Sequence, residues 1–142
     1  MRLAEKAFRD YPSHYHADGR LDPRKSDQVY PSWAFRTCVS REAADQVLVA
    51  ECEGAVAGFA SIRLNGLEEA DVVLFAVDPA WQGQGIARSL LVHTLEWCRS
   101  RNVSRVLYST QITNHPAQRL LVRLGFEPIR ASYTFHKWFD GA

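Results

Sequence analysis

The stretch Val-Asp-Pro-Ala-Trp-Gln-Gly-Gln-Gly-Ile-Ala-Arg, residues 77–88, joins an apolar run to an amphipathic run and decides the predicted fold. The run before it, residues 71–77, is almost wholly apolar and is typical of a strand buried on both faces. The run after it, residues 85–100, repeats apolar residues every three to four positions, as a helix with one buried side does. Between them stand Gly83 and Gly85, which permit backbone conformations of positive φ and close approach to a ligand.

This glycine junction has the properties of an anion site. The first turn of the following helix exposes unpaired N–H groups at the positive end of the helix dipole, which suits a phosphate or pyrophosphate. A Walker A loop is excluded because Gly-Lys-Ser/Thr is absent. The dinucleotide fingerprint is excluded because Arg88 occupies the place of the third glycine and residues 78–82 separate the strand from the glycines. From these residues alone, a tight turn onto a helix remains the alternative.

The rest of the chain predicts a mixed sheet with helices packed on it, in a single α/β domain of residues 1–142. We expect helices over residues 3–8, 23–38, 85–100 and 115–124, with Pro31 ending or kinking the second. Strands are expected over residues 46–52, 56–64, 71–77, 105–111 and 129–139. Asp22 is the predicted N-cap of the second helix and Asn114 that of the fourth.

Composition excludes several classes of function. The net charge is +1 and no basic face is evident, so no nucleic-acid partner is expected. The N-terminus is charged and no stretch approaches about 20 apolar residues, so we expect neither a signal peptide nor a membrane span. Cys38, Cys52 and Cys98 lack metal-ligand spacing and are interpreted as reduced thiols, which indicates a cytoplasmic protein. His14 and His16, with Asp18, are a poor metal signal, so no metal is expected.

Two motifs in sequence give a resemblance to a known family. Residues 82–87, Gln-Gly-Gln-Gly-Ile-Ala, fit the pattern Q/R-x-x-G-x-G/A, which is the pyrophosphate signature of the GNAT superfamily of acyltransferases. Residues 114–126, from Asn114 through Leu124-Gly125-Phe126, resemble the second motif of that superfamily. The order and spacing agree over residues 46–126. The chain is therefore identified as similar to GNAT N-acetyltransferases, whose fold has a mixed central sheet with two splayed strands.

The resemblance implies that acetyl-CoA is the co-substrate and that residues 71–77 and 105–111 splay apart to admit it. Backbone groups of the first of these strands would pair with the pantetheine arm, and the amides of residues 83–88 would hold the pyrophosphate. The backbone N–H of Val77 would stabilise the oxyanion. The implied cofactor-binding residues are Phe75, Ala76, Val77, Gln82, Gly83, Gln84, Gly85, Ile86, Ala87, Arg88 and Asn114.

The resemblance also implies candidate catalytic residues. Asp71 matches a position where some members carry a carboxylate base, and Ser109 stands where others have a glutamate and can position a water. The tyrosine that usually protonates the departing thiolate is replaced by Leu121. Tyr108 and His136 are alternative donors, together with Tyr133; each also fits a packing role.

The acceptor is expected to be a small primary amine. Residues 13–21 and the ending Thr-x-His-Lys-Trp, residues 134–138, resemble the dTDP-fucosamine acetyltransferases, which implies the amino group of a nucleotide-linked sugar. The diphosphate of such a substrate needs cationic partners, and its nucleobase or sugar needs aromatic rings to stack on. The available cations are Arg20, Arg24, Lys25, Arg36 and Arg63, and the available aromatic residues are Tyr15, Tyr30 and Trp33. Alternatively, these are solvated charges and core aromatics. A peptide amine and a non-catalytic acyl-CoA-binding module remain open as other functions.

The sequence begins at or just before the first expected helix, whereas the superfamily normally has a strand before it. Either the first strand is absent or the sequence starts too late to include it. An absent first strand would expose a sheet edge, and exposed edges pair with other chains. A homodimer is therefore expected.

Overall fold

The computed structural model describes residues 2–9, 11 and 13–139 of the 142-residue chain. Its helices are α1 (Arg2–Phe8), α2 (Pro23–Val39), α3 (Ile86–Ser100) and α4 (His115–Arg123), with 3-10 turns η1 (His14–His16) and η2 (Pro79–Trp81). Its strands are β1 (Gln46–Cys52), β2 (Ala55–Asn65), β3 (Glu69–Val77) and β4 (Arg105–Tyr108). Up to α4, the elements follow the predicted order.

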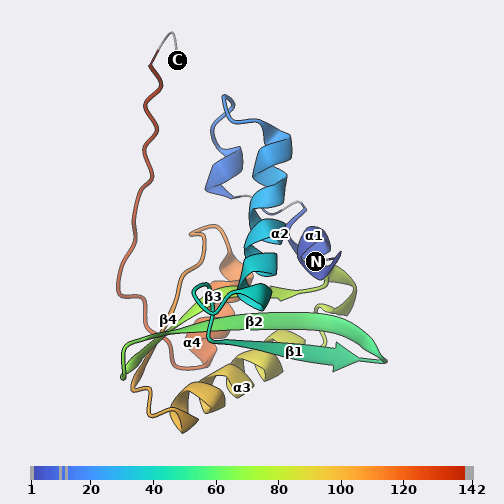
Figure 1. Cartoon of the computed structure of the whole chain (residues 1–142), viewed down its shortest axis with the longest axis vertical. Coiled ribbons are helices and arrows are strands. Elements are labelled where there is room, and N and C mark those ends of the chain that lie inside the picture. The colour runs from blue at the N-terminus through green and yellow to red at the C-terminus, as the bar shows by residue number, and fades with distance from the viewer. Residues whose placement is uncertain (1, 10, 12, 140–142) are drawn as a thin grey trace.

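The four strands form one mixed sheet in the order β1-β2-β3-β4. Neighbouring strands are antiparallel from β1 to β3, and β4 lies parallel to β3, with α3 as the crossover between them. α1 and α2 cover one face of the sheet and α3 covers the other (Figure 1). This arrangement confirms the predicted mixed sheet flanked by helices. Within the described residues, no helix is long and apolar enough to cross a membrane.

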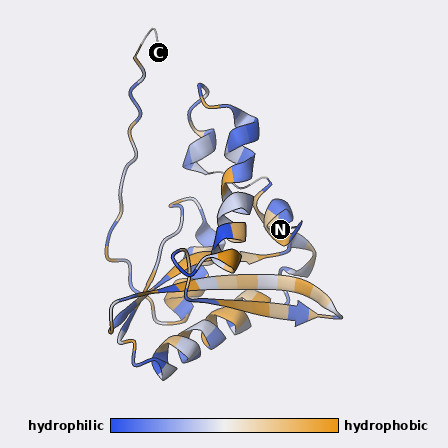
Figure 2. Cartoon of the chain, in the orientation of Figure 1, coloured by the Kyte–Doolittle hydropathy of each residue, from blue (hydrophilic) through white to orange (hydrophobic). Residues whose placement is uncertain are grey.

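An apolar cluster on each face of the sheet holds the layers together. On the α1 and α2 face, the rings of Phe8 and Tyr30 stack with centroids 4.5 Å apart. On the α3 face, Cys98 packs with Ile62 and Ala70 in a fully buried cluster. Figure 2 shows hydrophobic residues concentrated in the strands, whereas the N-terminal half of α2 is hydrophilic.

One of the two outcomes predicted for Pro31, that it ends α2, was wrong. Asp22 caps the helix, since its side chain accepts a hydrogen bond from the N–H of Arg24, but Pro31 does not end the helix, which continues to Val39. Proline removes one helical hydrogen bond and crowds the preceding turn. The helix face containing Tyr30, Pro31 and Ala34 is buried, and this packing offsets that cost.

The C-terminal segment, defined here as residues 126–139, contradicts the predicted strand over residues 129–139. It contains neither helix nor strand, and it runs away from the sheet (Figure 1). Alternating side chains favour a strand only if the backbone finds a partner. No backbone–backbone hydrogen bond joins residues 127–139 to the rest of the described chain. β4 is also shorter than predicted: it ends at Tyr108 rather than at residue 111.

Replacing Ile62 with valine is expected to lower the free energy of unfolding by roughly 0.5–1.5 kcal/mol. Ile62 is 0% exposed, so loss of one methylene leaves a cavity that its neighbours cannot fill. Denaturant-induced unfolding measures the change. Val49→Ala, at a position 54% exposed on β1, is the control and is expected to change stability by less than about 0.5 kcal/mol. Equal losses in both variants would show that burial is not the cause.

Candidate active site

A β-bulge in β3 opens the sheet between β3 and β4. Ser61 and Ile62 are neighbours on β2, yet they pair with Leu74 and Val72, so Val73 is an extra residue in β3. Bulges bend a strand and increase its twist. The pairing of β3 with β4 ends at Val72, directly before the bulge. β3 continues to Val77 without β4, which gives the splay expected of residues 71–77 and 105–111 and also explains the early end of β4.

Backbone groups of β3 face this opening. The N–H of Asp78 donates to the carbonyl of Ala57 beside β2, at 2.8 Å. Because successive residues of a strand point their backbone groups to opposite sides, the N–H and C=O groups of Val77 and Phe75 point away from β2. The carbonyl of Val77 accepts a hydrogen bond from the side-chain amide of Gln82 at 3.3 Å. The N–H of Val77 and both groups of Phe75 are left for an extended amide ligand.

The glycine junction lies directly after this strand. Asp78 Oδ1 accepts from the N–H of Ala80 at 3.0 Å, and its Oδ2 accepts from Lys6 of α1 at 3.1 Å. The Ala80 N–H, and then Lys6, hold the pKa of the Asp78 carboxyl below its usual value. Gly83 and Gly85 have φ of 77° and 82°, in the left-handed region that favours glycine.

The beginning of α3 leaves amides available to an anion. Gly85 is the N-cap of α3 and has no side chain that could accept a hydrogen bond from the helix. The N–H groups of the first helical turn therefore have neither an intrahelical partner nor a side-chain cap. Ile86, Ala87 and Arg88 occupy this turn, and the Arg88 side chain is exposed beside it. Gln84 and both glycines are also exposed. The junction can therefore hold a pyrophosphate through backbone donors and one guanidinium.

Asn114 caps α4, in the connection that follows β4. Its Oδ1 accepts from the N–H of Ala117 at 3.3 Å, and its Nδ2 donates to Thr110 Oγ1 at 3.0 Å. Replacing Asn114 with alanine is expected to lower the free energy of unfolding by about 1 kcal/mol, because the cap is lost. Asn114→Ser should recover most of that loss, since serine caps nearly as well. Thermal or denaturant unfolding of both variants tests this, and equal stability of the alanine variant and the parent would contradict it.

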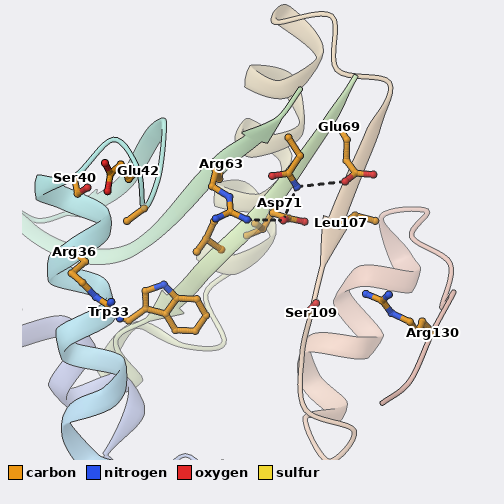
Figure 3. A pocket seen from close by; sticks show the side chains of 14 residues that line it. Trp33, Arg36, Ser40, Glu42, Arg63, Glu69, Asp71, Leu107, Ser109 and Arg130 are labelled. Atoms are coloured by element: carbon orange, nitrogen blue, oxygen red, sulfur yellow. Dashed lines mark hydrogen bonds and ion pairs between the residues drawn. The ribbon is translucent and has the colours of Figure 1, made fainter. Parts of the chain in front are cut away.

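A hollow of about 620 Å³ lies on the α2 side of the sheet, beside the first half of β3. Its walls come from α2, the β2–β3 hairpin, β4 and the C-terminal segment (Figure 3). The lining residues are Trp33, Arg36, Ser40, Glu42, Ala43, Arg63, Asn65, Glu69, Asp71, Val72, Val73, Leu107, Ser109 and Arg130. Among the described residues that line the hollow, Arg36, Arg130 and Glu42 are in no ion pair, so the hollow presents two unneutralised guanidinium groups and one unneutralised carboxylate.

Asp71 stands at the centre of this hollow. Its Oδ2 accepts from Asn65 Nδ2 at 2.7 Å and lies 3.8 Å from Arg63 Nη2 (Figure 3). Glu69, two residues earlier on β3, is instead paired with Arg105 of β4. Asp71 therefore keeps one carboxylate oxygen without a hydrogen bond to the described residues, and it can accept a proton from a bound amine.

The structure brings two of the four predicted catalytic residues together. Asp71 and Ser109 both line the hollow. Tyr108 does not line it; its ring lies beside Phe75, with centroids 5.9 Å apart, and burial raises the pKa of its hydroxyl. His136 does not line the hollow that contains Asp71 and Ser109. It lines a smaller hollow of about 330 Å³, together with Asp18. No set of three or more His, Cys, Asp or Glu side chains in the described residues is placed to hold a metal ion.

Sequence reasoning missed Asn65 and Arg130 as members of the site. Asn65 lies just after the strand expected over residues 56–64 and carried no predicted role, and Arg130 was expected only as part of the strand over residues 129–139. The β2–β3 hairpin offered a signal for Asn65, because residues equidistant from position 67 pair across that hairpin. Arg63 with Asp71, and Asn65 with Glu69, are such pairs in the observed register. No sequence signal placed Arg130, because its segment lacks regular structure.

Comparison with known proteins identifies the family. Residues 5–126 match the acetyltransferase (GNAT) family, and the chain belongs to it. The chain is 30% identical over 129 residues to the spore coat polysaccharide biosynthesis protein SpsD of Bacillus subtilis, covering 89% of this chain and 43% of that protein. It is 28% identical over 133 residues to the ribosomal protein bS18-alanine N-acetyltransferase of Escherichia coli K12, covering 93% of this chain and 84% of the enzyme.

A solved structure agrees with the fold. The crystal structure of the Escherichia coli ribosomal-protein-S18-alanine N-acetyltransferase superposes with a TM-score of 0.57 at 30% identity, covering 60% of this chain and 54% of that one. The chain thus spans about half the length of the spore coat protein, and the structural superposition covers about half of the solved enzyme. One relative is named for polysaccharide biosynthesis and the other for acetylation of a ribosomal protein. The comparisons therefore identify the family but not the acceptor of the acetyl group.

Proposed function

We propose that this chain transfers the acetyl group of acetyl-CoA to a primary amine by direct attack. The observation that best supports this proposal is the bulge at Val73, which separates β3 from β4 and leaves the backbone of Phe75 and Val77 facing the opening. That opening leads to the glycine junction at one end and borders the hollow that contains Asp71. A donor site and an acceptor site thus meet at one strand of a GNAT protein.

The donor site fits acetyl-CoA, which supplies the activated acetyl thioester. The amides from Gly83 to Arg88 bind the pyrophosphate, with the Arg88 guanidinium adding positive charge. Phe75 and Val77 pair with the amides of the pantetheine arm, as one strand pairs with another. Ala76 has its backbone groups directed to β2 and its side chain buried in the cluster with α1 and α2, so it holds the strand in place between Phe75 and Val77. Gln82 fixes the strand end through the carbonyl of Val77, which keeps the N–H of that residue aimed into the opening.

The acceptor amine binds in the hollow and must lose a proton before it attacks. Asp71 takes that proton through a relay of waters, one of which Ser109 positions, because six strand residues, roughly 20 Å, separate Asp71 from Val77. The N–H of Val77 donates to the thioester oxygen, where negative charge develops. Arg63 and Asn65 hold the carboxylate of Asp71 in place.

The departing thiolate needs a proton from a group other than Leu121. Leu121 occupies the usual tyrosine position and is buried. Tyr108 borders the opening beside Phe75, and a tyrosine hydroxyl, with an ordinary pKa of about 10, carries its proton at neutral pH. We therefore assign proton donation to Tyr108 rather than to His136.

The acceptor that best fits the hollow carries negative charge and a ring. Trp33 offers a stacking surface, and Arg36 and Arg130 offer charge for a diphosphate. This supports the amino group of a nucleotide-linked sugar. A second candidate is the N-terminal alanine of a protein, because the E. coli relative is named for that activity.

Release of free thiol from acetyl-CoA tests both acceptors. We expect a dTDP-linked 4-amino-4-deoxy sugar to accelerate release, and a peptide with N-terminal alanine is the second amine to compare. If CoA binds and no amine accelerates release, the chain is an acyl-CoA-binding module instead. CoA at 100 times its dissociation constant should raise the free energy of unfolding by about 2.7 kcal/mol. No stabilisation by CoA would overturn the donor site itself.

A homodimer is the remaining proposal. β1 has one neighbour in the sheet of the described residues, so its other edge is free to pair with a second copy. Light scattering tests this, and a monodisperse monomer would contradict it.

A further inference from the structure

One carboxylate gathers hydrogen bonds from two distant parts of the chain. Asp18 Oδ2 accepts from His136 Nδ1 and from Trp138 Nε1, each at 2.7 Å. Its Oδ1 accepts from the backbone N–H of Arg20 at 2.9 Å. The Arg20 N–H, and then His136 and Trp138, lower the pKa of Asp18 to about 2, so the carboxylate is charged at neutral pH. The Arg20 guanidinium also lies over the Trp138 ring, 5.9 Å from its centroid.

These contacts attach the C-terminal segment, which is otherwise little constrained. The last backbone bond between it and the rest of the described chain is from the N–H of Phe126 to the carbonyl of Leu121. Beyond it, Tyr133 and Phe135 are 90% and 89% exposed. The alternate side chains, at positions 134, 136 and 138, face the loop before α2. The segment is thus held at its start and again at Asp18.

Between these two attachments, the segment carries Arg130 to the hollow. Arg130 forms one wall, whereas Trp33 and Arg36 of α2 form another (Figure 3). The loop that contains Asp18 leads into α2, since Asp22 caps that helix. The Asp18 contacts therefore tie the segment bearing Arg130 to the element bearing Arg36.

We propose that Asp18 is a positioning residue for the acceptor: by binding His136 and Trp138 it fixes the C-terminal segment so that Arg130 stands in the hollow opposite Arg36. This inference rests on the proposed function only in naming the acceptor as the molecule that Arg130 contacts. Arg130 binds the anionic part of the acceptor, and Asp18 acts on binding through Arg130. The donor site shares no residue with this arrangement.

Limited proteolysis measures the attachment without any substrate. Trypsin cleaves after Arg130 and Lys137, and mass spectrometry follows each cut in the intact chain. Asp18→Ala and Trp138→Phe should each speed cleavage after Arg130 by about tenfold, since each removes a hydrogen bond to a charged group. Asp27→Asn is the matched control, because it disrupts the neighbouring pair of His16 with Asp27 and should leave the rate unchanged. Unchanged cleavage in both test variants would overturn the proposal.

Kinetics with the dTDP-linked 4-amino-4-deoxy sugar then test the action through Arg130. Asp18→Ala, Trp138→Phe and Arg130→Ala should each raise the acceptor KM by about tenfold, with kcat and the KM for acetyl-CoA retained. The double variant Asp18→Ala/Arg130→Ala should be no worse than Arg130→Ala alone, because both changes remove the same contact. Additive effects would overturn the proposal. If the parent acetylates no amine, the proposed function fails, and the cleavage rates still decide whether Asp18 fixes the segment.

Discussion

Replacing Gly85 with valine is expected to weaken CoA binding by about 10- to 100-fold. Gly85 has a φ of 82°, where a residue with a Cβ atom costs roughly 1–2 kcal/mol and a β-branched residue costs more. A Cβ there meets no atom within 4 Å, so the strain comes from the backbone and not from a clash. The chain relieves this strain by changing conformation at the junction, which turns the amides before Ile86 away from the pyrophosphate. Isothermal titration calorimetry with CoA measures the loss.

Gly54 provides a control with the same local strain. It has a φ of 75°, a Cβ there also meets nothing within 4 Å, and it lies in the turn between β1 and β2. Gly54→Val should lose similar stability while keeping the parent affinity for CoA. Equal weakening in both variants would mean that the effect is general destabilisation, and the glycine junction would lose its assigned role.

The sequence predicted best those elements whose boundaries depend on local chemistry. β1 occupies residues 46–52 as predicted, because the Glu53-Gly54 pair takes up positive φ at both positions and closes a tight hairpin. α4 begins at the predicted cap because Asn114 satisfies a free amide there. The junction at residues 77–88 was found for the same reason: glycines and a helix start are both local features.

Features that depend on distant partners were not predictable in this way. The bulge at Val73 has no sequence signal, because Val72, Val73 and Leu74 fit either face of a strand with both sides covered. The bulge nevertheless ends the pairing with β4 at Tyr108, so it decides where the predicted strand over residues 105–111 stops. The period-two alternation near Tyr133 indicated a strand, but alternation does not show whether a partner backbone exists. For the same reason the sequence did not predict Arg130 as a site residue, since it reaches the hollow from that same segment.

Replacing Asp71 with asparagine is expected to lower kcat/KM for the amine by about 10²- to 10⁴-fold at neutral pH. The amine arrives mostly protonated, and the amide cannot take its proton. Asparagine keeps the size of aspartate and can still bond to Asn65 through an amide flip, so the fold should be retained. Thiol release from acetyl-CoA, followed against pH, is the measurement, with CoA affinity as a check on the donor site.

The pH profile separates a base from a merely structural carboxylate. As pH rises toward the pKa of the amine, free amine appears without help, so the deficit of Asp71→Asn should shrink. A loss from misplaced substrate would instead stay constant with pH. Glu69→Gln is the matched control, because Glu69 lines the same hollow two residues away but is paired with Arg105. It should retain activity within a few fold. If Glu69→Gln loses as much as Asp71→Asn, or if the deficit does not change with pH, then Asp71 is not the base, and the proton leaves the amine through water alone.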